Sequence, residues 1–272
     1  MTLPVPGPRP LVDSFGRVHR DLRISVTDRC NFRCTYCMPA EGMQWLPREE
    51  ILTFEEIERV ARVAVETFGF DGIRLTGGEP TVRAHLPVLV AKLARLGADV
   101  AMTTNGATLP GLAHDLRAAG LGRINISCDS LRRDRFHAMT RRDELDRVLA
   151  GIDAAVAAGF DPVKVNVVLV KGVNDDEIVD FASFGRVRGV EVRFIELMPL
   201  DADHAWSGDR VVRAEDVVAA IDAVFPLAPV VRGHEPAERF VYRDGGGSVG
   251  VIASVTRPFC GNCDRVRLTA EG

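Results

Sequence analysis

The sequence predicts an α/β fold of six strand–helix units, arranged as an incomplete (β/α)6 TIM-like barrel with a C-terminal extension. Between residues 22 and 225, a short run of β-branched and apolar residues recurs six times, and an amphipathic helical pattern follows each run. Strands that alternate with helices form a parallel sheet with right-handed crossovers. Six units are two short of a closed barrel, and the strand pattern alone leaves an open doubly wound sheet as the alternative.

The predicted strands are short and bounded by polar or glycine residues. They are Leu22–Thr27, Gly72–Thr76, Asp99–Thr103, Arg123–Cys128, Val163–Val170 and Glu191–Met198. The apolar run Val165–Val170 is typical of a strand covered on both faces.

The first predicted helix begins at Thr53, because Glu56 three residues later completes a capping box. Apolar residues then recur at helical spacing, and Gly69 ends the segment. Later helices are predicted over residues 85–96, 110–119, 143–158, 174–187 and 213–224.

A different pattern begins after residue 225. Arg239–Arg243, the turn Gly245–Gly247 and Ser248–Val255 predict a β-hairpin that leads to Cys260 and Cys263. We therefore expect three parts: a flexible leader over residues 1–20, the partial barrel over 21–225 and the extension over 226–272.

The charge balance excludes several classes of protein. The 272 residues include 34 Lys plus Arg and 38 Asp plus Glu, a formal net charge of −4, so a nucleic-acid or anionic-membrane partner is not expected. The first ten residues carry four prolines and no apolar leader. The sequence contains no run of about 18 apolar residues, the length needed to cross a membrane. We expect a cytoplasmic protein, where cysteines are more often metal ligands or catalysts than disulfides.

Polar residues or glycines follow the predicted strands at their carboxyl ends, the edge where parallel α/β folds bind ligands. They are Thr27 and Asp28, Gly77–Pro80, Thr103–Gly106, Ser127 and Asp129, and Glu196 and Met198, with Lys164 and Asn166 inside the fifth strand. This recurrence predicts one shared active site.

Three cysteines with the spacing Cys30-x3-Cys34-x2-Cys37 follow the first strand. A structural zinc ion requires four ligands, and no histidine lies nearby to complete the set. A zinc site that joins Cys34 and Cys37 to Cys260 and Cys263 is the alternative, but it leaves Cys30 without a role. A four-iron cluster with three protein thiolates and one open iron fits the spacing better.

The segment from Leu22 to Cys37, followed one strand later by Gly77–Pro80, resembles the radical S-adenosylmethionine (SAM) superfamily. Further stretches resemble its GTP 3′,8-cyclase family: Ile73–Pro80, Thr103–Gly106, Val163–Val168, Lys171-Gly172, Arg193–Met198, Phe259–Cys263 and Arg265–Arg267. The resemblance extends from Asp21 to the last residue.

The resemblance implies that Cys30, Cys34 and Cys37 hold a [4Fe–4S] cluster whose open iron binds SAM. One electron from the cluster splits SAM into methionine and a 5′-deoxyadenosyl radical. The residues that this family implies for the SAM site are Tyr36, Gly78, Ser127 and Met198.

The implied substrate is GTP, cyclised between the ribose C3′ and the guanine C8 in the first step of molybdenum cofactor biosynthesis. The family positions that contact GTP carry Arg23, Arg74, Thr103, Lys164, Arg265, Val266 and Arg267. Arginine suits this role because its planar fork matches phosphate oxygens.

The resemblance also implies a second [4Fe–4S] cluster, on the C-terminal extension. Cys260 and Cys263 match two of its ligands, whereas the third cysteine, expected further along the chain, is absent from the 272 residues. We therefore expect a truncated sequence with an incomplete second site, and a defective second cluster is the alternative.

The family implies two protein partners: a synthase that converts the product to cyclic pyranopterin monophosphate, and an electron donor such as a flavodoxin or ferredoxin. The sequence leaves the oligomeric state open, a homodimer included. Two alternative functions remain at this point: another radical SAM enzyme with an auxiliary cluster, such as a peptide-modifying maturase, and a non-enzymatic metal-binding protein.

Overall fold

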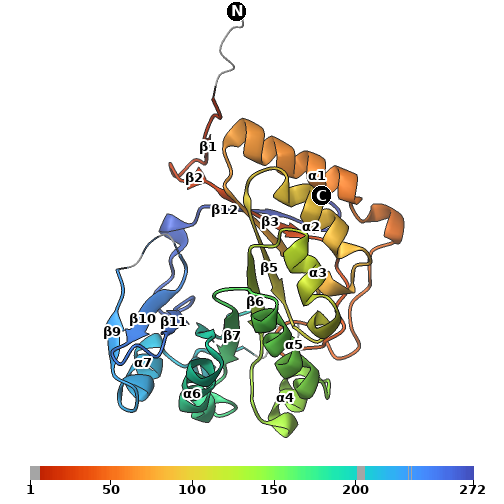
Figure 1. Ribbon diagram of the computed structural model, residues 1–272. Helices are drawn as coiled ribbons and strands as arrows, with labels where there is room; N and C mark the ends of the chain where they lie inside the picture. The colour runs from red at the N-terminus through yellow and green to blue at the C-terminus, as the bar shows by residue number, and fades with distance from the viewer. Residues whose placement is uncertain (1–6, 201–205, 232, 234) are drawn as a thin grey trace, which may run out of the picture.

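The computed structural model describes residues 7–200, 206–231, 233 and 235–272. Its main sheet contains the six predicted strands in chain order (Figure 1). They are β3 (Asp21–Ser25), β4 (Gly72–Thr76), β5 (Asp99–Thr104), β6 (Arg123–Ser127), β7 (Lys164–Leu169) and β8 (Glu191–Glu196).

Each of these strands pairs in parallel with the next one along the chain. A doubly wound sheet would reverse its strand order part-way, so the uninterrupted order identifies single-direction winding, as in a barrel. The sheet curves into an arc with helices along its outer side (Figure 1). The partial barrel is therefore confirmed, and the doubly wound alternative was wrong.

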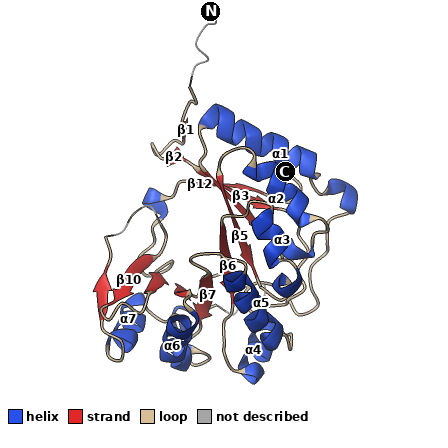
Figure 2. Cartoon of the chain, in the orientation of Figure 1, coloured by secondary structure: helices blue, strands red, loops and turns tan. Residues whose placement is uncertain are grey.

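Helices follow the strands near the predicted positions (Figure 2). They are α1 (Phe54–Arg62), α2 (Leu86–Ala94), α3 (Ala113–Ala118), α5 (Leu145–Ala157), α6 (Ile178–Arg188) and α7 (Ala214–Asp222). The capping box is present, since Thr53 Oγ1 accepts from the Glu56 amide and the Glu56 carboxylate accepts from the Thr53 amide. One further helix, α4 (Arg133–Thr140), was not predicted.

The predicted hairpin is confirmed as β10 (Glu238–Tyr242) and β11 (Ser248–Ile252), which pair antiparallel. β11 also pairs in parallel with β8, and β9 (Leu227–Pro229) lies on the other side of β10. A strand that was not predicted, β12 (Arg265–Leu268), pairs in parallel with β3. The C-terminal segment thus extends both edges of the six-stranded arc.

Within the predicted leader, β1 (Leu11–Val12) and β2 (Val18–His19) form a two-stranded antiparallel pair. Residues 1–6 lie outside the described part of the chain. The division at residues 20 and 225 stays a prediction.

The two faces of the arc differ in polarity because side chains alternate along each strand. Leu22, Ile24, Ile73 and Leu75 are buried in the core that the outer helices cover. Between them, the residues on the other face of β3 and β4 are only half-buried, and they include two arginines. The inner face of this partial barrel is therefore polar.

Candidate active site

The cysteine-bearing loop follows β3 and packs against α4. The Thr35 amide donates to the Met139 carbonyl at 2.9 Å, and the rings of Phe32 and Phe136 meet edge to face with centroids 6.0 Å apart. The helix that was not predicted from sequence thus supports the loop on which the predicted cluster depends.

The three cysteines of this loop fit an iron–sulfur cluster by their chemistry. All three are free; Cys30 and Cys34 are half-buried, and Cys37 is exposed. Burial raises the pKa of each thiol, an effect that coordination to a metal would oppose. Within the described residues, no three His, Cys, Asp or Glu side chains are grouped to hold one metal ion. A four-iron cluster binds each thiolate on a separate iron, so its ligands need not meet at one ion.

The glycine loop after β4 lies against the segment that leads into the cysteines. The amides of Gly78 and Glu79 donate to the carbonyls of Thr27 and Arg29, both at 2.8 Å. A Cβ atom on Gly78 would overlap the carbonyl oxygens of Asp28 and Arg29. Glycine is therefore required here for two loops to approach this closely.

Glu79 connects the glycine loop to the end of β5. Its buried carboxylate accepts from Thr104 Oγ1 and the Asn105 amide, both at 2.6 Å, and from the amide and hydroxyl of Thr81. Burial raises the pKa of Glu79, and these hydrogen bonds oppose the rise. Asn105 Nδ2 in turn donates to Asn31 Oδ1 at 2.7 Å, next to the first cysteine.

The residues predicted for the SAM site come from neighbouring segments at one end of the sheet. Tyr36 belongs to the cysteine loop, Gly78 follows β4, Ser127 ends β6, and Met198 follows β8 and is 38% exposed. The fold therefore gathers them along one rim. Their contact with SAM stays a prediction.

Tyr36 has a partner that the sequence did not reveal. Its hydroxyl donates to Asp129 Oδ2 at 2.5 Å, and the Val168 amide donates to Asp129 Oδ1 at 2.8 Å. Burial raises the pKa of Asp129 to about 6, although both hydrogen bonds oppose the rise. The sequence marked Asp129 as polar at a strand end but not as the partner of Tyr36, because the two residues are 93 positions apart.

The cations predicted to bind GTP lie on the inner face of the sheet. Arg23 in β3 is in register with Arg74 in β4, and Asn125 in β6 lies between Thr103 in β5 and Lys164 in β7. The fold thus brings these predicted residues to one surface.

The charges on this face are poorly compensated. Among the described residues, Arg23, Arg74 and Lys164 make no ion pair, and the Nε atoms of both arginines are buried without a hydrogen-bond partner. Burial, followed by repulsion from Arg265 and Arg74, lowers the pKa of Arg23 to about 10. Burial also lowers the pKa of Arg74 and of Lys164. An anionic ligand would supply the missing counter-charge.

Two more arginines in the barrel strands were not predicted as site residues. Arg193 pairs with Glu191 at 2.6 Å and with Glu235 at 3.0 Å, and Arg123 pairs with Asp99. Their alternation with core residues was the signal that could have placed them. Both have direct carboxylate partners, whereas the predicted cations are attracted by nearby carboxylates such as Asp21 and Glu191 without forming an ion pair with them.

The second pair of cysteines lies in the turn before β12. Cys260 is exposed, and Cys263 is half-buried and accepts from Arg265 Nε at 3.2 Å. Burial acts to raise the pKa of Cys263, but the hydrogen bonds and charge of Arg265 lower it overall. Arg17 donates to the Cys260 carbonyl at 2.6 Å. A thiol with a lowered pKa suits a metal ligand.

β12 carries the remaining predicted GTP residues. Val266 is in register with Leu22, and Arg267 is in register with Arg23. Among the described residues, Arg265 makes no ion pair, and it lies close enough to Arg23 to repel it. The fold therefore brings the end of the sequence beside the first strand of the barrel.

In the described part of the chain, no helix combines the length and apolar character needed to cross a membrane.

Two family models together match almost all of the chain. The model of the radical SAM superfamily matches residues 24–185, and the model named Molybdenum Cofactor Synthesis C matches residues 190–272. The first match ends within α6, and the second begins just before β8.

Curated relatives are identical to this chain at about half of the aligned positions. The GTP 3′,8-cyclase of Corynebacterium glutamicum is 48% identical over 282 residues, which cover 99% of this chain and 75% of that protein. The GTP 3′,8-cyclase of Streptomyces coelicolor is 49% identical and covers 98% of this chain and 80% of that protein.

Solved structures resemble the fold at low sequence identity. Methylornithine synthase (PylB) superposes with a TM-score of 0.60 at 18% identity, over 77% of this chain and 63% of that one. The protein anSMEcpe with bound AdoMet gives a TM-score of 0.56 at 18% identity, over 75% of this chain and 60% of that one. The matched family models and the identity to curated relatives over nearly the full chain agree with the cysteine loop and glycine loop described above. The chain belongs to the GTP 3′,8-cyclase family of the radical SAM superfamily.

Proposed function

We propose that this protein cyclises GTP to (8S)-3′,8-cyclo-7,8-dihydroguanosine 5′-triphosphate, the first step of molybdenum cofactor biosynthesis. The observation that carries the substrate is the pair Arg23 and Arg74, which lie side by side without a carboxylate partner among the described residues. A triphosphate provides several oxygens at the spacing of adjacent guanidinium forks. Its binding explains how a chain with a net charge of −4 takes a polyanion, since local charge outweighs the total.

Cys30, Cys34 and Cys37 would hold the first [4Fe–4S] cluster, with SAM bound at its open iron. When bound, the cluster supplies the electron that divides SAM into methionine and a 5′-deoxyadenosyl radical. Gly78 lets the glycine loop approach the cysteine segment, and Tyr36, Ser127 and Met198 line the same rim.

The remaining predicted residues orient GTP. Arg23, Arg74 and Lys164 hold the triphosphate from the inner face, Thr103 donates a hydroxyl hydrogen bond, and Arg265–Arg267 approach from β12. This grip would place the ribose so that its 3′ hydrogen passes to the radical from SAM and C3′ joins C8 of the guanine, and one further electron and one proton would then complete the 7,8-dihydro product.

Cys260 and Cys263 would contribute to a second [4Fe–4S] cluster, beside which Arg265 lies. The product then passes to a cyclic pyranopterin monophosphate synthase, and a flavodoxin or ferredoxin supplies electrons. We place the reaction in the cytoplasm. A homodimer is compatible with this role.

The proposal is tested by anaerobic incubation of the reconstituted protein with reductant, SAM and GTP. We expect 5′-deoxyadenosine and the cyclised nucleotide in equal amounts, and no product from Cys30→Ala, Cys34→Ala or Cys37→Ala. Cleavage of SAM with a peptide but not with GTP would instead favour a peptide-modifying maturase. Zinc without acid-labile sulfide after reconstitution would favour a non-enzymatic metal-binding protein.

A further inference from the structure

Side chains from outside the cysteine loop hold it at several places. Arg142 donates to the carbonyl of Asn31, and Arg141 donates to the carbonyls of Arg33 and Met38. In its first half, Asn31 accepts from Asn105, which follows β5. In its second half, Tyr36 lies between Cys34 and Cys37, and its hydroxyl donates to Asp129 beyond β6. The ring of Tyr36 packs in a small apolar cluster with Met139, Val170 and Leu197, apart from the main core.

Asp129 is well placed to hold a hydroxyl in a fixed position. The residue is 3% exposed, and its second carboxylate oxygen accepts from the Val168 amide in β7. Both oxygens therefore have protein partners. Asp129 also lies two residues after Ser127, a predicted SAM residue, so one strand end reaches both the SAM rim and the cysteine loop.

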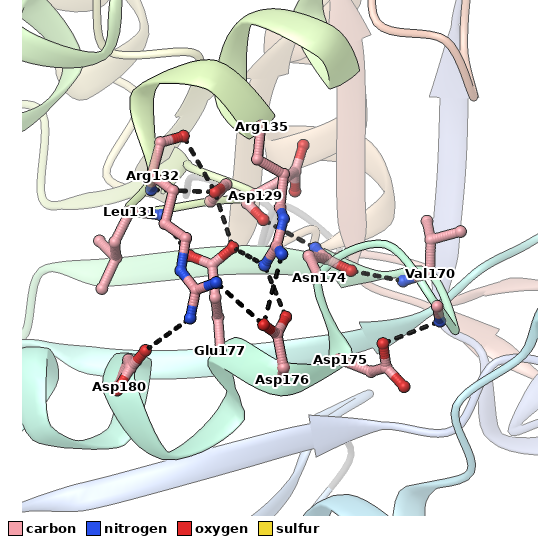
Figure 3. A network of polar contacts seen from close by, with 12 residues as sticks. Asp129, Leu131, Arg132, Arg135, Val170, Asn174, Asp175, Asp176, Glu177 and Asp180 are labelled. Atoms are coloured by element: carbon pink, nitrogen blue, oxygen red, sulfur yellow. Dashed lines mark hydrogen bonds and ion pairs between the residues drawn. The ribbon is translucent and has the colours of Figure 1, made fainter.

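The backbone of Asp129 is fixed from behind by Asn174, which is fully buried (Figure 3). Asn174 Nδ2 donates to the carbonyls of Asp129 at 2.7 Å and Val168 at 2.9 Å, and its Oδ1 accepts from the Val170 amide at 2.7 Å. Asn174 thereby clamps the ends of β6 and β7 together.

In the loop after β6, the residues that follow Asp129 are fixed by Glu177, which lies just before α6. Its carboxylate accepts from Ser130 Oγ and the Leu131 amide, both at 2.7 Å, and from Arg135 of α4 at 2.5 Å (Figure 3). Buried polar groups that are fully satisfied in this way form rigid networks. Asp129 is thus a preorganised acceptor and does not adjust freely to the loop.

We propose that Asp129 is a positioning residue of the radical SAM site: through Tyr36 it fixes the Cys34–Cys37 half of the cysteine loop relative to the rim that binds SAM. The proposal rests on the proposed function only in that the loop holds a cluster that binds SAM. It requires nothing of GTP.

The hydrogen bond is tested with Tyr36→Phe, Asp129→Leu, the double variant and Asp129→Asn, each reconstituted anaerobically as the full chain. Tyr242→Phe is the matched control, because Tyr242 in β10 is the other of the two tyrosines. SAM is titrated into the reduced protein without GTP, and the change in the EPR spectrum of the cluster is followed. The rate of iron release to a chelator is measured in parallel.

We expect Tyr36→Phe and Asp129→Leu each to raise the SAM concentration at half-maximal spectral change about tenfold, the effect of one charge-assisted hydrogen bond. The double variant should need no more SAM for the half-maximal change than Asp129→Leu does, since both substitutions remove the same hydrogen bond. Asp129→Asn should stay within about threefold of the unsubstituted protein, because its amide can accept from Val168 and donate to Tyr36 Oη. Iron release should follow the same order, and Tyr242→Phe should change neither readout.

Additive effects in the double variant, or a Tyr36→Phe variant that titrates like the unsubstituted protein, would overturn the proposal, because Asp129 would then act by another route. If Asp129→Leu does not fold, Tyr36→Phe carries the test, since its ring keeps the same apolar neighbours. The readouts are independent of GTP, so failure of GTP cyclisation and failure of this proposal are distinguishable.

Discussion

Arg23 in β3 lies directly beside Arg74 in β4, and neither guanidinium has a carboxylate partner among the described residues. Burial lowers the pKa of both groups, and repulsion from neighbouring cations adds to this effect, whereas attraction to Asp21 opposes it. Like charges side by side on neighbouring strands destabilise a sheet. The arrangement is therefore one that a bound anion stabilises and the free protein does not.

Replacing Arg74 should separate binding from stability. We expect Arg74→Met to leave the ligand-free protein as stable as before, or more stable by about 0.5–1 kcal/mol, because a repulsion is removed. GTP affinity should fall about tenfold or more with the loss of a phosphate-binding fork. Thermal unfolding with and without GTP measures both, since a ligand stabilises according to its affinity.

The exposed Arg59 on α1 supplies the control for that experiment. Arg59→Met should change neither the midpoint temperature of unfolding nor the increase in that temperature when GTP is added. A destabilised Arg74→Met protein that keeps the full GTP shift would show that Arg74 serves the fold instead of the ligand.

Gly78 offers a test of the close approach between two loops. Its added Cβ would overlap backbone oxygen atoms, which cannot move aside as a flexible side chain can. We expect Gly78→Ala to lower the free energy of unfolding by about 1–3 kcal/mol and to weaken SAM binding, measured by urea unfolding and equilibrium dialysis.

Gly111 is the matched control, because a Cβ there meets nothing within 4 Å. Gly111→Ala should be neutral or stabilise by up to about 1 kcal/mol, since alanine restricts the unfolded chain. Equal effects of the two substitutions would mean that the glycine loop can retreat without consequence.

The order of strands and helices was readable from the sequence because the alternation of apolar and polar residues is a local signal. Helix α4 lacks that signal: no side chain caps its first residue, and it ends at Arg141 in a left-handed conformation without a glycine. It is stabilised mainly by tertiary packing, such as that of Phe136 on Phe32.

The site was predicted where residues of known chemistry follow a strand, and missed where two distant residues meet. The three cysteines and the glycine loop are contiguous motifs. The bond from Tyr36 to Asp129, the clamp of Asn174 and the pairing of β12 with β3 join segments far apart in the chain. A single sequence holds no local trace of such pairs.

Glu196 fastens the extension to the last barrel strand. Its buried carboxylate accepts from Thr256 Oγ1 at 2.5 Å and from the amides of Val255 and Thr256, both at 2.8 Å. In Glu196→Gln an NH2 group would face these donors, so we expect a loss of about 1–3 kcal/mol in the free energy of unfolding. Limited proteolysis should then cut the segment after β11 faster.

Glu66, exposed on the π-helical turn after α1, provides the comparison. Glu66→Gln removes a surface ion pair and should change stability by less than about 0.5 kcal/mol. If Glu196→Gln is cleaved at the same rate as this control, Glu196 does not fasten the extension to β8.

Glu191 predicts how stability depends on pH. Its buried carboxylate is within hydrogen-bond distance of Arg193, Arg239 and Ser248. Burial acts to raise its pKa, but the attraction of Arg193 and the hydrogen bonds lower it below the ordinary value of 4.5. The folded protein therefore binds this proton less readily than the unfolded chain, so the stabilisation is fully present above pH 4.5 and is lost as the pH falls below it.

We expect Glu191→Gln to be less stable by about 2 kcal/mol at neutral pH, and urea unfolding at a series of pH values should show this gap closing below about pH 4.5. A gap that stays constant as the pH falls would mean that Glu191 stabilises the fold by packing, because only an ionised carboxylate that is favoured in the folded state produces a difference that acid removes.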